Sequence, residues 1–255
     1  MTAFLASYKN EFDKLLRRKK YIVFLCIGIG ICLISTIIGI LVTNFAKDHG
    51  VSFSFNRFFT PTPMGALPFF LQVFIPFLMF MGVTDLITVE GAENTMKAII
   101  CRPVERWKLY ASKILAVVTY AAAYLAFIFI FCTLMTLIFG KTLGVKEFFI
   151  ALASYSLTLI PLAILASFAA LVALFGRSGT LTMFLLIALY ILLNVLPIFF
   201  PVLTEMLFTS YLSWYRLWIG ALPGASKLLH MLIIVFGYGT VFFTAGSLIF
   251  DRKEY

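Results

Sequence analysis

Long apolar runs, separated by short polar segments, dominate the chain. A helix that crosses the hydrocarbon core of a membrane needs about 20 mostly apolar residues, because each residue adds about 1.5 Å. Six runs reach this length and are predicted to be membrane-spanning helices: Tyr21–Phe45, Leu67–Val89, Trp107–Phe139, Phe148–Phe175, Thr180–Phe200 and Leu228–Phe250. The pattern therefore predicts an all-α membrane protein with six transmembrane helices, in a single domain over residues 1–255.

Prolines interrupt the second and fourth runs, among others. Pro68 and Pro76 lie in the second run and Pro161 lies in the fourth. Proline has no N–H to donate, but membrane helices tolerate it where neighbouring groups satisfy the freed carbonyl. We therefore keep both runs as spans and predict a kink near Pro161.

Residues 1–20 have the periodicity of an amphipathic helix. Their large apolar side chains recur at helical spacing, while the basic cluster Arg17–Lys20 precedes the first span. This pattern predicts a helix in the cytoplasmic interface, in contact with anionic membrane lipids. The alternative is a charged flank that only orients the first span. The segment does not resemble a cleavable signal peptide, because the following apolar run is too long and lacks an A-x-A-like site.

The segment 201–227 is too apolar for a free loop and too interrupted for a full span. It carries Tyr211, Trp214, Tyr215 and Trp218, and then a Pro-Gly pair. We predict an outer re-entrant hairpin of short helices with aromatic side chains at headgroup level. The alternative is an aromatic belt that anchors the fifth span to the sixth.

Composition and charge support this membrane topology. The 255 residues are 62% hydrophobic and 12% charged, whereas a soluble domain has roughly 25% charged residues. If the N-terminus is cytoplasmic, fourteen of the twenty Lys and Arg residues fall on the inner side, as the positive-inside rule requires. Both termini are therefore predicted to be cytoplasmic. The net charge of +9 reflects this topology, and nucleic-acid binding is not expected. The four cysteines are expected to be small buried hydrophobes without disulfides.

The chain offers few groups for catalysis. Asp85, near the inner end of the second span, is predicted to pair with a base rather than to react. His49 and His230 lack partners at metal-ligand spacing. Gly140-Lys141-Thr142 resembles the end of a P-loop, but Met135 stands where the motif requires a glycine. We expect no catalytic, metal or cofactor site in this chain, so ATP and Mg²⁺ would have to bind to a partner subunit.

The most polar long stretch is 89–113, between the second and third spans. Within it, Glu90 to Cys101 has the features of a short helix. Acids occupy its first turn, Glu93 precedes Lys97 by four residues, and Arg102-Pro103 ends the pattern. The alternative is a solvated loop whose charges only set the topology. A rigid helix here would be a cytoplasmic coupling helix, able to fit a groove on another protein.

The same stretch resembles a known family signature. Glu90, the run Glu93-Asn94-Thr95-Met96-Lys97, the run Arg102-Pro103-Val104-Glu105-Arg106, and Lys113 are similar to the loop of ABC-2 type transporter permeases, the membrane subunits of type V ABC exporters. The pattern departs from the family at Asn94, where glycine is usual, and at Glu105, where a small polar residue is common. The six-span layout and the amphipathic N-terminus are also similar.

The resemblance implies a permease that pairs with a second permease, as a homodimer or a sister heterodimer, on two ATPase subunits. The coupling loop 90–106 would contact the ATPase through seven residues: Glu90, Glu93, Thr95, Lys97, Arg102, Pro103 and Arg106. It further implies the plasma membrane of a Gram-positive bacterium, and an amphipathic peptide cargo like that of lantibiotic and phenol-soluble-modulin exporters. Gln72 and Asn194 are candidate polar groups on the cargo path, or else they make local helix–helix hydrogen bonds.

Two other functions remain open from the sequence. A non-transporting scaffold or immunity protein would have the same six-span layout without needing ATP. An intramembrane lipid-modifying enzyme would need a buried catalytic cluster, and the spans show none.

Overall fold

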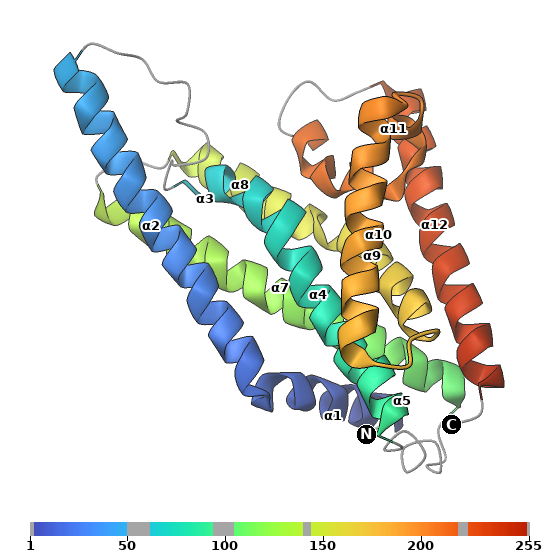
Figure 1. The fold of residues 1–255 in the computed structure, drawn as a ribbon. Helices are drawn as coiled ribbons and strands as arrows, with labels where there is room; N and C mark the ends of the chain where they lie inside the picture. Colours follow the sequence, from blue (N-terminus) through green and yellow to red (C-terminus); the bar gives the residue numbers. More distant parts are fainter. Residues whose placement is uncertain (1–2, 50–61, 94–104, 140–143, 219–223, 254–255) are drawn as a thin grey trace.

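The computed structural model describes residues 3–49, 62–93, 105–139, 144–218 and 224–253, and its elements there are helices (Figure 1). Six stretches are long and apolar enough to cross a membrane: Lys19–Leu41, Pro63–Ala92, Arg106–Ile138, Val145–Ala173, Gly179–Phe199 and Leu229–Arg252. The six predicted spans are confirmed. The second begins four residues earlier than predicted, because the Thr62 hydroxyl caps the helix by accepting the Gly65 N–H.

The spans run between two ends of the molecule, and the described chain starts and finishes at the same end (Figure 1). This end also holds α1, α5 and the start of α7. We call it the basic end because of the Lys and Arg side chains on α1 and at the start of α7. The elements in order are α1 (Ala3–Arg17), α2 (Lys19–His49), α3 (Pro63–Phe69), η2 (Phe70–Phe74), α4 (Ile75–Val83), η3 (Thr84–Val89), α5 (Glu90–Ala92), α7 (Arg106–Ile138), α8 (Val145–Leu157), α9 (Leu159–Ala173), α10 (Gly179–Phe199), α11 (Leu203–Met206), η4 (Phe208–Trp218) and α12 (Ala225–Arg252).

The second span is a composite helix with two π-helical segments, η2 and η3. Pro76 follows η2 and has no N–H to donate to the carbonyl of Gln72, four residues earlier. The Tyr190 hydroxyl on α10 donates to that carbonyl instead, at 2.8 Å. The proline is thus accommodated by a hydrogen bond from a neighbouring span, as expected for membrane helices.

Prolines shape two other spans. The kink predicted near Pro161 is confirmed as a break at Thr158, which separates α8 from α9. Pro197 lies inside α10, and the carbonyl four residues before it, on Leu193, accepts a hydrogen bond from Thr209 of η4 at 3.4 Å. The α8–α9 break therefore lies next to a missing proline N–H, while α10 continues through Pro197.

The predicted N-terminal amphipathic helix is confirmed as α1, which packs along α7. Tyr8 donates its hydroxyl proton to Thr119 of α7 at 3.0 Å, and the hydroxyls of Ser7 and Ser112 lie 3.3 Å apart. Leu15 is buried, whereas Leu5 is about half exposed. One face of α1 therefore binds the protein itself, so the segment does more than orient the first span, and its position in the lipid interface stays a prediction.

The segment before the last span forms the predicted short helices, α11 and η4. The aromatic side chains expected at headgroup level are instead partly inside the protein, since Tyr211, Trp214 and Tyr215 are buried. Phe208 also packs against Phe168 of α9. These side chains pack within the protein, and their level relative to the headgroups stays a prediction. The depth of the hairpin in the outer leaflet stays a prediction.

The cysteines lie mostly as expected. Cys32 on α2 and Cys132 on α7 are buried with their sulfur atoms 3.7 Å apart, while Cys26 is exposed. The prediction of burial is therefore wrong for Cys26, which lies on the outward side of α2. Cys101 lies outside the described residues.

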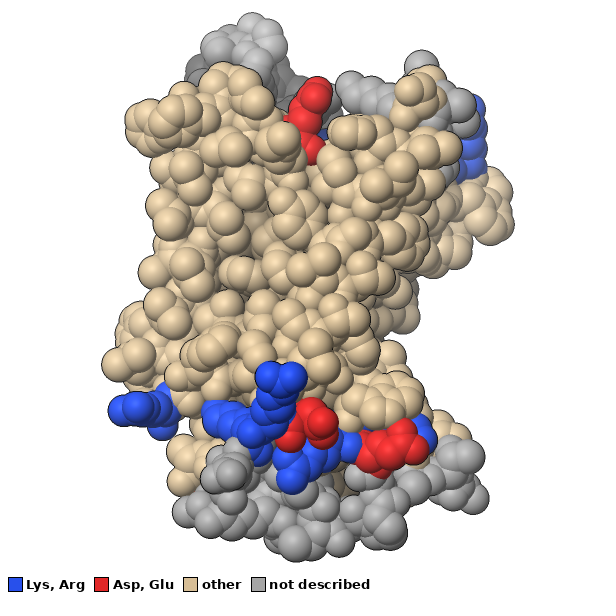
Figure 2. All heavy atoms as spheres, turned by 90° about the vertical axis from the view of Figure 1, so that its right-hand side faces the viewer, with Lys and Arg blue, Asp and Glu red and all other residues tan. Residues whose placement is uncertain are grey.

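Three spans bury little of their surface against the rest of the chain. The share of buried residues is 22% in the first span and 11% in each of the fifth and sixth. Figure 2 shows the face on the α12 side, where a broad band without charged side chains separates charged groups at the two ends. A band of this kind fits the hydrocarbon core of a bilayer. The chain is a multi-pass membrane protein.

Candidate functional site

Four charged side chains from three elements form a closed ring at the basic end. Glu11 and Lys14 come from α1, Glu90 from α5 and Lys113 from α7. Lys113 Nζ lies 3.0 Å from Glu11 Oε2 and 2.6 Å from Glu90 Oε2. Lys14 Nζ lies 3.0 Å from Glu11 Oε1 and 2.7 Å from Glu90 Oε1. In each carboxylate, therefore, one oxygen faces Lys14 and the other faces Lys113.

Three of the four members of this ion-pair ring are almost completely shielded from solvent within the chain, whereas the Lys14 side chain is 28% exposed. Glu11 is 0% exposed, Lys113 1% and Glu90 4%. Burying an isolated charge costs several kcal/mol, and only well-placed opposite charges and hydrogen bonds offset that cost. The ring alternates two acids with two bases and has no net charge. The ring therefore joins α1, α5 and α7. Removing the charge of any one member would leave an opposite charge short of a partner, at a cost in folding free energy.

Lys14 lies on α1, which is outside the membrane-spanning segments, as does Glu11. Burial disfavours its charged form, but the hydrogen bond from Lys14 to Glu90 and the negative charges of Glu11 and Glu90 outweigh burial and raise the pKa of Lys14. A raised lysine pKa contributes stability that is fully present below the unfolded value of 10.5 and lost as pH rises through the folded value. Lys14 therefore stays charged at neutral pH.

A second ion cluster lies next to the ring. Asp85 in η3 is 4% exposed and pairs with Arg18 at 2.9 Å and with Lys20 at 2.5 Å. The Tyr21 hydroxyl also donates to Asp85, at 2.7 Å. The prediction that Asp85 pairs with a base is confirmed. These contacts fix the junction between α1 and α2 to the part of the second span at the basic end.

The π-helix η3 explains how Asp85 and Glu90 both reach the N-terminal segment. In an α-helix, residues five positions apart point about 140° away from each other, at 3.6 residues per turn. A π-helix bonds i to i+5 and holds more residues per turn, which brings such positions toward one face. In this chain Asp85 pairs with Arg18 and Glu90 pairs with Lys14.

The last span joins the same end of the molecule. Arg106 at the start of α7 donates to the backbone carbonyl of Asp251 at 2.5 Å, and Lys253 donates to the carbonyl of Leu174 after α9. Burial lowers the pKa of Lys253. These contacts connect the starts and ends of the third, fourth and sixth spans.

The predicted coupling residues have different positions in the structure. Glu90 was predicted to face the ATPase, but it is buried in the ion-pair ring and holds the root of the loop in place. Glu93 ends α5 and is exposed. Arg106 is half-buried at the other end of the loop. Thr95, Lys97, Arg102 and Pro103 lie outside the described residues, as does most of the helix predicted for Glu90 to Cys101.

The two candidate path residues lie close to Tyr190. Gln72 is exposed, and its backbone carbonyl accepts the Tyr190 hydroxyl. Asn194 is exposed, and its side-chain amide donates to the Tyr190 carbonyl one turn earlier on α10, at 2.8 Å. The Asn194 amide therefore makes a hydrogen bond within its own helix, and the helix–helix hydrogen bond that was the alternative interpretation is not what it forms here. Both residues lie where the second and fifth spans meet.

Sequence reasoning missed the partners of Glu90. Glu11 was not singled out from the sequence, yet it lies three residues after Tyr8 and four before Leu15, on the buried stripe of α1. An acid on an apolar stripe is the signal that indicates a buried partner. Lys113, one turn and a half inside an apolar run, carried the same signal.

Among the described residues, no three His, Cys, Asp or Glu side chains lie close enough to hold a metal ion. The family model described as "ABC-2 family transporter protein" matches residues 8–194, which include the ring, the Asp85 cluster and the first five spans up to Asn194. No curated protein matches the chain.

Proposed function

The chain belongs to the ABC-2 family of transporter proteins, and we propose that it is the permease subunit of an ABC exporter driven by a separate ATPase. ABC-2 permeases are membrane transport subunits that normally work with an ABC ATPase. In the proposed complex, two permeases, identical or sister, stand on two ATPase subunits that bind ATP and Mg²⁺. The basic end faces the cytosol, where the positive-inside rule puts Lys and Arg.

The ion-pair ring is the observation that carries the proposal. A push on the loop after Glu93 acts on α5, and the ring connects α5 directly to α1 and α7. Buried ion pairs resist separation, so these three elements move together rather than one at a time. Coupling of ATP hydrolysis to movement of the spans needs a contiguous physical connection between the ATPase and the spans. In this proposal the ring supplies that connection.

The proposal gives the loop residues separate roles. Exposed Glu93 contacts the ATPase, together with Thr95, Lys97, Arg102 and Pro103 of the same loop. Glu90 positions the loop through Lys14 and Lys113. Arg106 links the end of the loop to the last span. The loop is therefore attached to the bundle at both of its ends.

The proposed cargo is an amphipathic peptide or a similar hydrophobic molecule. The spans of the described chain keep their ionised side chains near the two ends, and the band between them is apolar (Figure 2). Charged groups at membrane depth mark ion pathways, and such a band favours an apolar cargo surface. Gln72 and Asn194 lie at the junction of η2 and α10, where that path is proposed to run.

The test is transport by the chain reconstituted with its ATPase. Glu93→Arg should reduce cargo-stimulated ATP hydrolysis and transport by at least about tenfold, since a like-charge contact at an interface costs several kcal/mol. Glu205→Arg is the matched control, because Glu205 is also an exposed acid but lies on α11 at the opposite end. It should leave both activities unchanged.

Three results would overturn the proposal. Transport by Glu93→Arg at the normal rate would show that Glu93 does not make the assigned contact with the ATPase. Failure of the chain to bind any ATPase when both are co-expressed would favour a non-transporting scaffold, and lipid turnover by the purified chain alone would favour an enzyme.

A further inference from the structure

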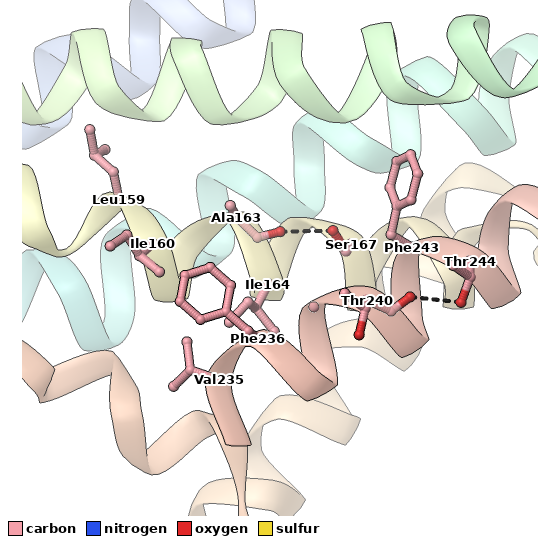
Figure 3. A pocket seen from close by; sticks show the side chains of 11 residues that line it. Leu159, Ile160, Ala163, Ile164, Ser167, Val235, Phe236, Thr240, Phe243 and Thr244 are labelled. Atoms are coloured by element: carbon pink, nitrogen blue, oxygen red, sulfur yellow. Dashed lines mark hydrogen bonds between the residues drawn. The ribbon is translucent and has the colours of Figure 1, made fainter. Parts of the chain in front are cut away.

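A groove of about 560 Å³ opens between α9 and α12 in the membrane-spanning part of the chain (Figure 3). Its floor is formed by Ile164, Ser167 and Val235, which are buried. Its rim on α12 is the ridge Phe236, Thr240 and Thr244, which is exposed and repeats every four residues. A volume of this size falls within the range of ~300–1,000 Å³ for small-molecule sites. We call it the α9–α12 groove.

The groove presents hydrocarbon to whatever fills it. Its three hydroxyl groups each donate back to a carbonyl of their own helix, Ser167 to Ala163, Thr240 to Gly237 and Thr244 to Thr240. The first and last of these hydrogen bonds are drawn in Figure 3, where Phe236 and Phe243 extend from α12 toward α9 and α7. With its hydroxyl protons already engaged, the lining favours an apolar ligand.

Small residues keep the groove open. Ala163 lines it on α9 and Gly239 lines it on α12. A Cβ added at Gly239 would lie 3.4 Å from Cγ1 of Ile164, so a longer side chain there would project into the groove. A Cβ added at Gly237, two residues away on the same helix, would meet nothing within 4 Å. The two glycines are therefore a matched pair for testing occupancy.

The same two helices carry cations at the basic end. Arg252 ends α12 and is exposed, and the adjacent Lys253 donates to the carbonyl of Leu174 just after α9. Arg177 is exposed three residues further along the chain. Arg106 is held against the Asp251 carbonyl. Basic clusters between membrane helices attract anionic headgroups.

The distance between cations and groove fits one lipid leaflet. Thirteen residues separate Gly239 from Arg252 on α12, which is about 20 Å at 1.5 Å per residue. Half of a bilayer with its headgroups is roughly 20–22 Å thick. A phospholipid whose phosphate lies at Arg252 would therefore have the end of its acyl chain at the depth of Gly239.

We propose that the α9–α12 groove holds an acyl chain of an anionic phospholipid whose phosphate is bound by Arg252 and the neighbouring cations of the basic end. The lipid fills space beside α12, a span that has few buried residues of its own. It is a structural lipid of the permease and is distinct from the exported cargo. This site does not depend on which cargo is moved.

The test uses the full chain in nanodiscs of phosphatidylglycerol and phosphatidylcholine. A phosphatidylglycerol probe with a photoreactive diazirine near the end of one acyl chain should label residues of α9 and α12 that line the groove. A phosphatidylcholine probe with the same chain should label them at least about fivefold less, since surface cations favour the anionic headgroup. Mass spectrometry of the labelled peptides locates the adducts.

Four variants separate the site from general lipid contact. Gly239→Leu should reduce groove labelling several-fold, whereas Gly237→Leu should not. Arg252→Glu should remove the preference for phosphatidylglycerol, whereas Lys9→Glu, a change at an exposed base on α1, should not. If Gly239→Leu does not fold, Ala163→Leu fills the groove from the α9 side.

Several results would overturn the proposal. Equal labelling by the two probes would show that the cations do not select an anionic headgroup. Unchanged labelling in both groove-filling variants would show that the groove does not hold the acyl chain. Efficient cross-linking between two chains carrying Thr240→Cys, with no lipid adducts in the groove, would show that a second copy of the chain occupies it.

Discussion

At the scale of single residues, Lys113 shows how a charge is tolerated inside this protein. Its ammonium group is 1% exposed and lies between Glu11 and Glu90. Removing one member of a buried ion pair leaves its partner charged and unpaired, which costs more than the pair contributed. The ring should therefore be far more sensitive to single changes than to changes that remove one acid and one base together.

Lys113→Met should destabilise the folded chain by ~3–5 kcal/mol, because Glu11 and Glu90 would then share only Lys14. The double variant Glu11→Gln with Lys113→Met should lose less, since it leaves the Glu90–Lys14 pair intact. Thermal unfolding in detergent gives the comparison. Lys108→Met is the control, because Lys108 pairs with exposed Glu105. A double variant less stable than Lys113→Met would contradict the ring.

Tyr190→Phe should remove the donor to the Gln72 carbonyl and cost ~0.6–1.7 kcal/mol, the range measured for side-chain hydrogen bonds in membranes. Pro76→Ala restores an N–H four residues after Gln72, so Tyr190→Phe should cost less in that background. A double-mutant cycle in unfolding free energy measures the difference. Equal costs in the two backgrounds would show that the proline does not free this carbonyl.

At the scale of elements, α1 belongs to the bundle because it packs along α7. Its apolar stripe was visible in the sequence, but an amphipathic helix packs equally well on a lipid surface or on protein. The contacts of Ser7 and Tyr8 with α7 decide between these surfaces. The composite second span shows the same limit. Its prolines predict an irregular helix, but the π-helical segments η2 and η3 depend on contacts with neighbouring helices.

Ser7→Cys combined with Ser112→Cys, in a chain without its native cysteines, should form a disulfide under mild oxidation. The two hydroxyl oxygens lie 3.3 Å apart, which is compatible with the close approach that a disulfide needs. The faster migration of the cross-linked chain on a gel and its reversal by a reductant are the measurement. Neither single variant should change. An α1 that rests only on lipid would give no cross-link.

At the scale of the whole molecule, the basic residues and the apolar band set the orientation. The described bases near the chain ends and on α1 lie at one end, and few bases lie at the other. By the positive-inside rule, we propose that the basic end faces the cytosol. In this proposed topology, the proposed groove lipid, the ring and the loop proposed to contact the ATPase all lie on the inner side, next to the ATPase and the anionic leaflet.

Glu93→Cys and Glu205→Cys should report this orientation in intact cells. A membrane-impermeant maleimide added outside should label Glu205→Cys, which lies at the opposite end, and should leave Glu93→Cys unlabelled until the membrane is opened. A chain without its native cysteines is the background for both variants. The reverse pattern would invert the topology and remove the proposed ATPase contact.

The sequence alone determined the class of protein, the six spans and the end at which charge collects. Hydrophobic thickness and the cost of moving charge across a membrane act on each segment locally, so a linear pattern is enough to predict them. The tertiary structure alone decided the partners of Glu11, Glu90 and Lys113. Glu90 meets Lys14 across 76 positions in the chain, and Lys113 meets Glu11 across 102. A buried charge requires an opposite charge nearby, but periodicity does not say which one, because only the packing of α1 on α7 brings these side chains within reach.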